Sequence, residues 1–217
     1  MPDGPRIVLV RHGRPDLSAD LTRAIAGHEL GRWYRGYDAA GVLESSAPPA
    51  ALRDAAVGAG CRVVASDARR ARESAARLTT PDRIRIEPLL REVGFPDAIS
   101  LGLQLAPGAW VLIARALQLL QRRSADAEAV RATRARASLA VDALASLAEE
   151  HETLVVVAHG WFNRFLAREL RRRGWIGPRW LPTGYWSAAT YRRPFRSSGR
   201  SAGGTGATRA RSRSWRN

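Results

Sequence analysis

Three short runs of apolar, largely β-branched residues recur along the chain, and helical patterns follow the second and third. The runs are RIVLV at 6–10, RVVAS at 62–66 and TLVVVA at 153–158. Runs of this length, bounded by turn residues or charge, predict buried strands. The segments DARRARESAARL and WFNRFLARELRRR, which come after the second and third runs, predict helices. Strands that alternate with helices predict an α/β fold of three layers, with helices on both faces of a mostly parallel central sheet.

Further segments fit this fold class. Helical patterns cover 48–58, 108–123 and 126–150, and WSAATYR at 186–192 is a candidate for a last strand. The segment 14–47 shows no clear period, and we expect an irregular region lying over one end of the sheet. Long segments in that position often line a substrate cleft. The residues of this segment that we expect to line a cleft or to pack within the loop are His28, Trp33, Tyr34 and Tyr37.

The last residues differ from the rest in composition. Residues 196–217 are mostly Ser, Gly and Arg, so we predict one domain over 1–195 followed by a disordered tail. The formal net charge is +15 and every basic residue is Arg, with eight of them in 192–217 and no Asp or Glu there. A strongly basic protein often binds polyanions. The tail therefore leaves a nucleic-acid contact open, beside the alternative of an inert extension.

Several protein classes are disfavoured. Cys61 is the single cysteine, so it forms no internal disulfide and offers no thiolate cluster for a metal. The most apolar stretch, 101–120, is interrupted by Pro107 and Arg115, which favours a core helix over a membrane span. The chain enters its first strand without the pattern of a secretory signal. We expect a cytoplasmic protein with no membrane contact.

Basic and imidazole side chains gather where the strands end. The first strand ends at Arg11 and His12, the third leads into His159, and the second leads into SDARRAR at 66–72. Ligands of parallel α/β sheets bind beyond the carboxyl ends of the strands. Guanidinium groups that would repel each other alone become favourable around a phosphoryl dianion. The amides at the start of each following helix are expected to point at the same anion.

The motifs LVRHGRP, SDARRARESA, LREV and VVVAHG occur in this order over residues 7–160. Together they resemble the histidine phosphatase superfamily, in the branch that contains the cofactor-dependent phosphoglycerate mutases. The resemblance implies that His12 is the nucleophile and carries the phosphoryl group as phosphohistidine. It implies that Arg11, Arg70 and His159 bind the phosphate. It implies that Glu92 is the proton donor.

Two stretches depart from the family pattern. Gly13 lets the backbone turn close to the anion, but residues 14–16 read Arg-Pro-Asp where many relatives have Thr or Ser and then Asn. Arg14 is therefore either an additional substrate contact or a solvated side chain. The residues after Glu92 also differ from the family, which leaves Asp97 as a second candidate for the proton donor.

The sequence predicts a metal-independent phosphatase that hydrolyses phosphomonoesters and needs no cofactor. The attacking imidazole nitrogen must be unprotonated, so the other ring nitrogen should donate to a fixed acceptor. The expected partner is a small phosphorylated substrate, whose identity stays open together with the oligomeric state. Two alternatives remain. One is a cofactor-dependent phosphomutase at the same site, and the other is a non-catalytic protein that binds anions or nucleic acid through the pocket or the basic tail.

Overall fold

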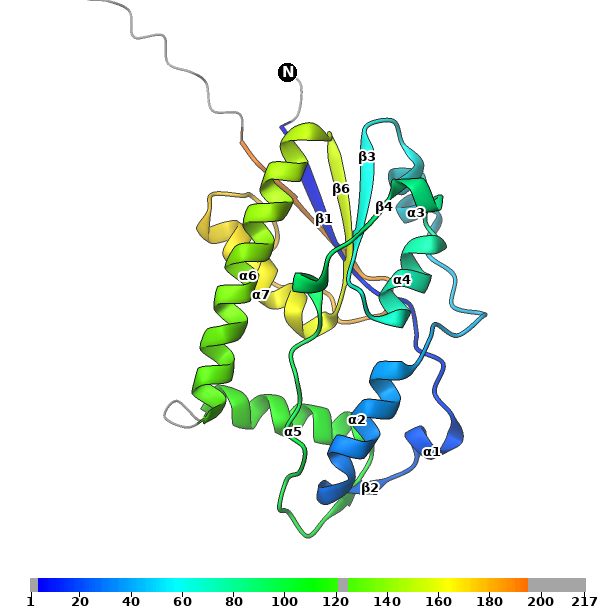
Figure 1. The fold of residues 1–217 in the computed structure, drawn as a ribbon, viewed down its shortest axis with the longest axis vertical. Coiled ribbons are helices and arrows are strands. Elements are labelled where there is room, and N and C mark those ends of the chain that lie inside the picture. Colours follow the sequence, from blue (N-terminus) through cyan, green and yellow to red (C-terminus); the bar gives the residue numbers. More distant parts are fainter. Residues whose placement is uncertain (1–3, 121–124, 195–217) are drawn as a thin grey trace, which may run out of the picture.

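Five strands form the central sheet in the order β4-β3-β6-β1-β7 (Figure 1). The computed structural model describes residues 4–120 and 125–194. The strands of this sheet are β1 (Arg6–Arg11), β3 (Cys61–Ala65), β4 (Ile84–Ile86), β6 (Thr153–Ala158) and β7 (Ala188–Arg192). Every neighbouring pair is parallel except β1 and β7, which run antiparallel. The predicted mostly parallel sheet is confirmed.

Burial follows the position of each strand. All six residues of β6 are buried, because this strand lies between β1 and β3 and has helices on both faces. The edge strand β7 instead alternates, with Ala189 and Tyr191 buried and Thr190 exposed. This alternation is typical of a strand with one solvated face.

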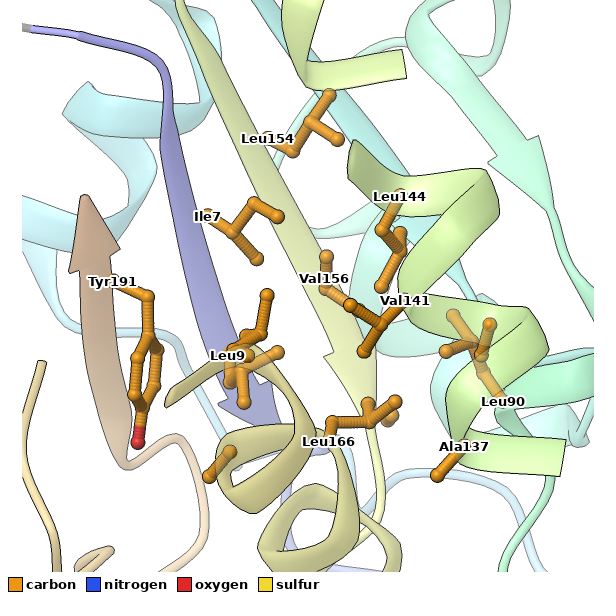
Figure 2. Close-up of a cluster of buried hydrophobic side chains, with 14 of the residues drawn as sticks. Ile7, Leu9, Leu90, Ala137, Val141, Leu144, Leu154, Val156, Leu166 and Tyr191 are labelled. Atoms are coloured by element: carbon orange, nitrogen blue, oxygen red, sulfur yellow. The ribbon is translucent and has the colours of Figure 1, made fainter. Parts of the chain in front are cut away.

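Helices cover both faces of the sheet and produce three layers (Figure 1). On one face α6 (Ala125–Glu150) and α7 (Gly160–Arg172) pack over the apolar side chains of β1 and β6. Figure 2 shows Leu9 and Val156 of this face turned toward the helices. On the other face α3 (Ala50–Val57) and α4 (Arg69–Ala76) pack over a second buried cluster. The side-chain period of two along each strand divides the residues between the two cores.

A smaller structural unit, here called the cap, lies beyond the carboxyl ends of β1 and β6 (Figure 1). It comprises residues 17–39 and 95–120. Its buried core is separate from the two cores of the sheet and consists of Ile25, Leu30, Trp33, Ile99, Trp110 and Ala114. The elements of the cap are α1 (Ala19–Thr22), β2 (Ile25–Ala26), the 3-10 helix η1 (Gly27–Glu29), α2 (Leu30–Ala39), β5 (Gln104–Leu105) and α5 (Pro107–Leu120).

The prediction of an irregular segment over 14–47 is wrong in part, because α2 is a helix of ten residues. Leu30, Trp33 and Tyr37 lie on one face of it, at the spacing of a helix. Two glycines weaken the helical signal of this segment. Gly31 is required there, because a Cβ atom at this position would lie 2.8 Å from the carbonyl oxygen of Asp97.

The other predicted elements agree with the structure to within a few residues, whereas no sequence pattern indicates β4 or the β2–β5 pair. Two further 3-10 helices, η2 (Pro81–Arg83) and η3 (Pro88–Leu90), flank β4. The predicted disordered tail at 196–217 lies outside the described residues, and the domain boundary at 195 stays a prediction. In the described part of the chain, no helix has the length and apolar character needed to cross a membrane.

Candidate active site

The turn that follows β1 places His12 at the carboxyl edge of the sheet. The N–H of Gly13 donates to the hydroxyl of Ser74 on α4, 2.9 Å away. A Cβ atom at position 13 would lie 2.8 Å from side-chain atoms of both Trp186 and Val42. Only glycine therefore fits this turn, which fixes the direction of the neighbouring His12 side chain.

His12 is held as a neutral imidazole. Its Nδ1 lies 2.7 Å from the carbonyl oxygen of Gly13, and since a carbonyl only accepts, Nδ1 carries the proton. The unprotonated Nε2 accepts from Nε of Arg70 at 3.3 Å. Burial, then the charge of Arg70, lowers the pKa of His12 to about 3, despite the opposing effect of the Gly13 bond. The lone pair of Nε2 is thus available at neutral pH, as a nucleophile requires.

Arg70 is the arginine of α4 that enters the site. Its side chain is fully buried, and Nη1 forms an ion pair with Asp38 at 3.0 Å. Its neighbour Arg69 is two-thirds exposed and pairs with Glu73 on the same helix. The exposed Arg72 also stays outside. The packing of α4 therefore brings Arg70, rather than Arg69 or Arg72, to His12 and His159.

His159 faces the same guanidinium group from the end of β6. Its Nδ1 lies 3.3 Å from Nη2 of Arg70, which can only donate, and its Nε2 donates to the hydroxyl of Ser66 at 3.0 Å. Burial is the main cause that lowers the pKa of His159 well below its ordinary value, followed by His12 and Arg70. The ring centroids of His12 and His159 are 5.2 Å apart. Two neutral imidazoles and one guanidinium group therefore meet at one point.

Arg11 lies beside this group. Nη1 donates to the carbonyl oxygen of Thr183, and the guanidinium carbon lies 4.3 Å from the centre of the Tyr185 ring. The buried Nε has no hydrogen-bond partner among the described residues. A buried donor of this kind is expected to meet an acceptor when a ligand binds.

Glu92 binds the start of α7. Its carboxylate accepts the backbone N–H groups of Trp161 at 3.2 Å and Phe162 at 2.9 Å, as well as that of Val93 at 2.9 Å. The expectation that the first amides of this helix point at a bound anion is therefore wrong for these two amides, because a carboxylate of the protein already binds them.

Asp97, the other candidate proton donor, lies apart from the site. Its side chain is 95% exposed and is 3.9 Å from Arg35. Glu92 and His12 instead line one cavity of about 560 Å³. Of the two acids, Glu92 is the one that this cavity brings together with the histidine.

Two arginines fix the backbone around Glu92. Arg115 of α5 donates to the carbonyl oxygens of Val93 at 2.8 Å and Gly94 at 3.0 Å. Arg136 of α6 donates to the carbonyl oxygens of Leu89 and Arg91 at 2.8 and 2.6 Å. The LREV segment is thereby tied to two helices, which restricts where the Glu92 carboxylate can move.

The cavity extends from His12 and Glu92 to the cap. The predicted cleft residues Trp33 and Tyr37 line it, whereas the exposed His28 does not, and the exposed Arg14 is also absent from its lining. Sequence reasoning did not assign several residues that line the cavity. These are Leu17, Leu21, Thr22, Phe95, Val111, Leu112, Arg115, Trp161, Arg164 and Tyr185. Trp161 directly follows the HG motif, whereas the loop that carries Tyr185 gave no comparable signal.

Within 4–120 and 125–194, no three side chains of His, Cys, Asp or Glu gather as a metal site requires. The groups that could hold an anionic ligand are the guanidinium groups of Arg11 and Arg70. The imidazole of His159 could join them only if its N–H left Ser66 or the ring took up a second proton.

Comparison with known proteins gives a family match over most of the chain. The model of the histidine phosphatase superfamily (branch 1) matches residues 7–192. No curated protein matches significantly. Among solved structures, phosphoserine phosphatase from Entamoeba histolytica, in complex with 3-phosphoglyceric acid, is 13% identical, with a TM-score of 0.54 over 85% of this chain and 89% of that one. A mycobacterial glucosyl-3-phosphoglycerate phosphatase complexed with VO3 is 21% identical, with a TM-score of 0.47 over 86% of this chain and 92% of that one. The similarity to the Entamoeba protein concerns the fold.

Proposed function

The chain belongs to the histidine phosphatase superfamily, branch 1, and from this membership we propose that it is a metal-independent phosphatase that hydrolyses phosphomonoesters through a phosphohistidine on His12. The observation that carries the proposal is the state of this residue. A buried imidazole has its Nδ1 proton bound to the carbonyl oxygen of Gly13 and its unprotonated Nε2 beside Arg70 and His159.

In the first step Nε2 of His12 attacks phosphorus, and the bond from phosphorus to the leaving oxygen breaks. The leaving oxygen takes a proton from the carboxyl group of Glu92, so the product is a free alcohol. The guanidinium N–H groups of Arg11 and Arg70 stabilise the charge on the equatorial oxygens of the phosphoryl group. The bond from Nδ1 to Gly13 keeps the imidazole in the required tautomer throughout.

In the second step the Glu92 carboxylate accepts a proton from a water molecule, and the resulting hydroxide attacks phosphorus. The bond between phosphorus and Nε2 breaks, inorganic phosphate leaves, and the lone pair of Nε2 is restored. The guanidinium groups supply the positive charge that Mg²⁺ supplies in other phosphoryl-transfer sites. Metal independence is thus part of the proposal.

The first test replaces the nucleophile. We expect His12→Ala to lose turnover of 4-nitrophenyl phosphate to background, while the exposed His28→Ala retains it. Glu92→Gln should slow turnover by about 10²- to 10⁴-fold, the usual contribution of general acid–base catalysis. Turnover that persists in His12→Ala would overturn the mechanism. Loss of turnover in Asp97→Asn rather than in Glu92→Gln would show that Asp97 is the proton donor.

A second measurement separates hydrolysis from phosphoryl transfer between hydroxyl groups. Steady release of phosphate without a bisphosphate cofactor, in the presence of EDTA, is the expected result. Isomerisation of a substrate that depends on such a cofactor would instead show that the protein is a mutase. Loss of activity in EDTA that a divalent cation restores would contradict metal independence.

The cytoplasmic location and the role of the basic tail stay predictions. The single Cys61 suggests the first, and the tail lies outside the described residues. Salt-sensitive binding of RNA or DNA that disappears on deletion of 197–217 would assign the tail a nucleic-acid partner.

A further inference from the structure

The cavity has two ends of different chemistry. Arg11, His12 and Glu92 lie at the end next to the sheet, and the rings of Tyr37 and Tyr185 border this end, close to Arg70 and Arg11. The opposite end is formed by the cap. The whole cavity has a volume of about 560 Å³, which is in the range of pockets that hold a small organic ligand and is larger than a phosphoryl group alone requires.

Apolar side chains form most of the wall at the cap end. They are Leu17, Leu21, Trp33, Phe95, Val111 and Leu112. Leu112 on α5 is 73% exposed, although it borders a cavity. Exposed apolar surface of this kind is stabilised when an apolar ligand removes it from water.

Aromatic side chains line the cavity between the phosphate end and the cap. The rings of Trp33 and Tyr37 are stacked, with centroids 5.3 Å apart and planes 22° apart. The guanidinium carbon of Arg70 lies 4.8 Å from the centre of the Tyr37 ring. A ring attached to a phosphate held by Arg70 would therefore lie along aromatic surface.

Several polar groups that line the cavity already have partners within the protein. The indole N–H of Trp33 donates to the carbonyl oxygen of Leu21 at 2.8 Å, and the hydroxyl of Thr22 donates to the carbonyl oxygen of Ala19 at 2.8 Å. Arg115 donates to the LREV segment, as described above. Arg164 is exposed, and its guanidinium carbon lies 4.8 Å from the centre of the Trp161 ring. A polyol would thus exchange its bonds to water for few bonds to the wall, which costs affinity.

We infer that the substrates of this site are phosphomonoesters whose leaving group is large, flat and mainly apolar, with an aromatic ring as the best fit, rather than sugar or polyol phosphates. The inference rests on the proposed phosphatase function and names the leaving group that the cap end accepts. The phosphate end binds the common phosphoryl group, and the cap wall discriminates between leaving groups.

The experiment compares kcat/KM for 1-naphthyl phosphate, phenyl phosphate, glycerol 2-phosphate and glucose 6-phosphate, by phosphate release from the full chain. We expect 1-naphthyl phosphate to exceed phenyl phosphate, whose leaving group is of similar acidity, by about tenfold, the lower end of what one apolar group contributes in a hydrophobic pocket. Leu112→Gln should lower this ratio. The matched control is Leu139→Gln, a leucine of α6 that is 59% exposed and absent from the cavity lining, and it should leave the ratio unchanged.

A binding measurement keeps the inference testable apart from turnover. Phenylphosphonate should bind the full chain more tightly than methylphosphonate. Tryptophan fluorescence can follow the binding, because Trp33 and Trp161 line the cavity. Hydrolysis of all four esters with equal kcat/KM, or a preference for the sugar phosphate, would overturn the inference and leave the phosphatase function standing. Absence of any turnover with tighter phenylphosphonate binding would overturn the function and support the apolar pocket. Equal binding of the two phosphonates would overturn the inference.

Discussion

At the scale of single residues, hydrogen-bond partners determine the protonation of the two site histidines. In each ring one nitrogen donates to an oxygen, Gly13 for His12 and Ser66 for His159, and the other accepts from Arg70. A guanidinium group cannot accept, so it selects the tautomer of both rings. In the mechanism that we propose, the attacking nitrogen of His12 is therefore already unprotonated, and no separate base has to remove a proton from it.

These neutral histidines make stability depend on pH. His12 has an ordinary pKa of 6.5 when unfolded and about 3 when folded, so between these values the unfolded chain binds more protons. The stability that the neutral His12 contributes is fully present above pH 6.5 and is lost as the pH falls toward 3, at up to about 1.4 kcal/mol per pH unit for one histidine. His159 acts in the same direction.

Urea unfolding at pH 7, 6 and 5 measures this effect. As the pH is lowered, the free energy of unfolding of the wild type should decrease more steeply than that of His12→Asn. The variant His28→Asn, at an exposed position, should keep the wild-type slope. Identical slopes in wild type and His12→Asn would contradict a buried neutral imidazole.

At the scale of elements, the start of α7 is stabilised by the same carboxylate that we propose as the proton donor. Glu92 accepts the N–H groups of Trp161 and Phe162, which have no partner within the helix. Glu92 therefore joins η3 and the LREV segment to α7, and its replacement affects structure as well as chemistry.

We expect Glu92→Ala to lower the free energy of unfolding by about 1–2 kcal/mol, as the loss of a helix cap does. Glu92→Gln retains an acceptor oxygen and should lose less. Asp97→Ala is the control, since the Asp97 side chain is 95% exposed. The measurement is urea unfolding together with phosphate binding, so that an effect on turnover can be separated from an effect on folding. A free energy of unfolding for Glu92→Ala equal to that of the wild type would show that Glu92 does not stabilise the start of α7.

Elements differ in how well their sequence predicts them. The strands β1, β3 and β6 were predicted because a buried parallel strand is a continuous apolar run. β4 was missed because three residues with the pattern IRI carry little signal. α2 was missed because Gly31 reflects a contact with the backbone of Asp97, which is distant in sequence.

At the scale of the whole molecule, the cavity lies between parts with separate cores. The cap surrounds Trp110, whose indole N–H donates to the carbonyl oxygen of Ile25 at 2.8 Å. The helices α6 and α7 and their face of the sheet share another core, which contains Trp175. We therefore expect the cap to loosen while the sheet and the site residues at its edge keep their structure.

Replacement of one buried tryptophan in each core tests this independence. Trp110→Leu should speed amide hydrogen exchange in 25–37 and 99–114 and leave β1 and β6 protected. Trp175→Leu should instead speed exchange near the start of β1 and in α7. Exchange measured by mass spectrometry on peptides resolves these segments. Uniform loss of protection in Trp110→Leu would show that the cap and the sheet unfold together.

The sequence by itself determined the α/β class, the positions of the three buried strands to within about one residue and the edge of the sheet at which Arg11, His12 and His159 meet. These follow from local patterns, since the period of apolar residues sets the element and parallel strands bring their ends to one edge. Only the tertiary structure decided the tautomers of the two histidines, the binding of Glu92 to α7 and the apolar wall of the cap. Each of these depends on contacts between residues far apart in the chain, such as Arg70 with His159, and such contacts are fixed by strand order and packing rather than by neighbouring residues. The RHG motif therefore predicts where a phosphoryl group binds, and we propose that the fold of the cap selects the group to which it is attached.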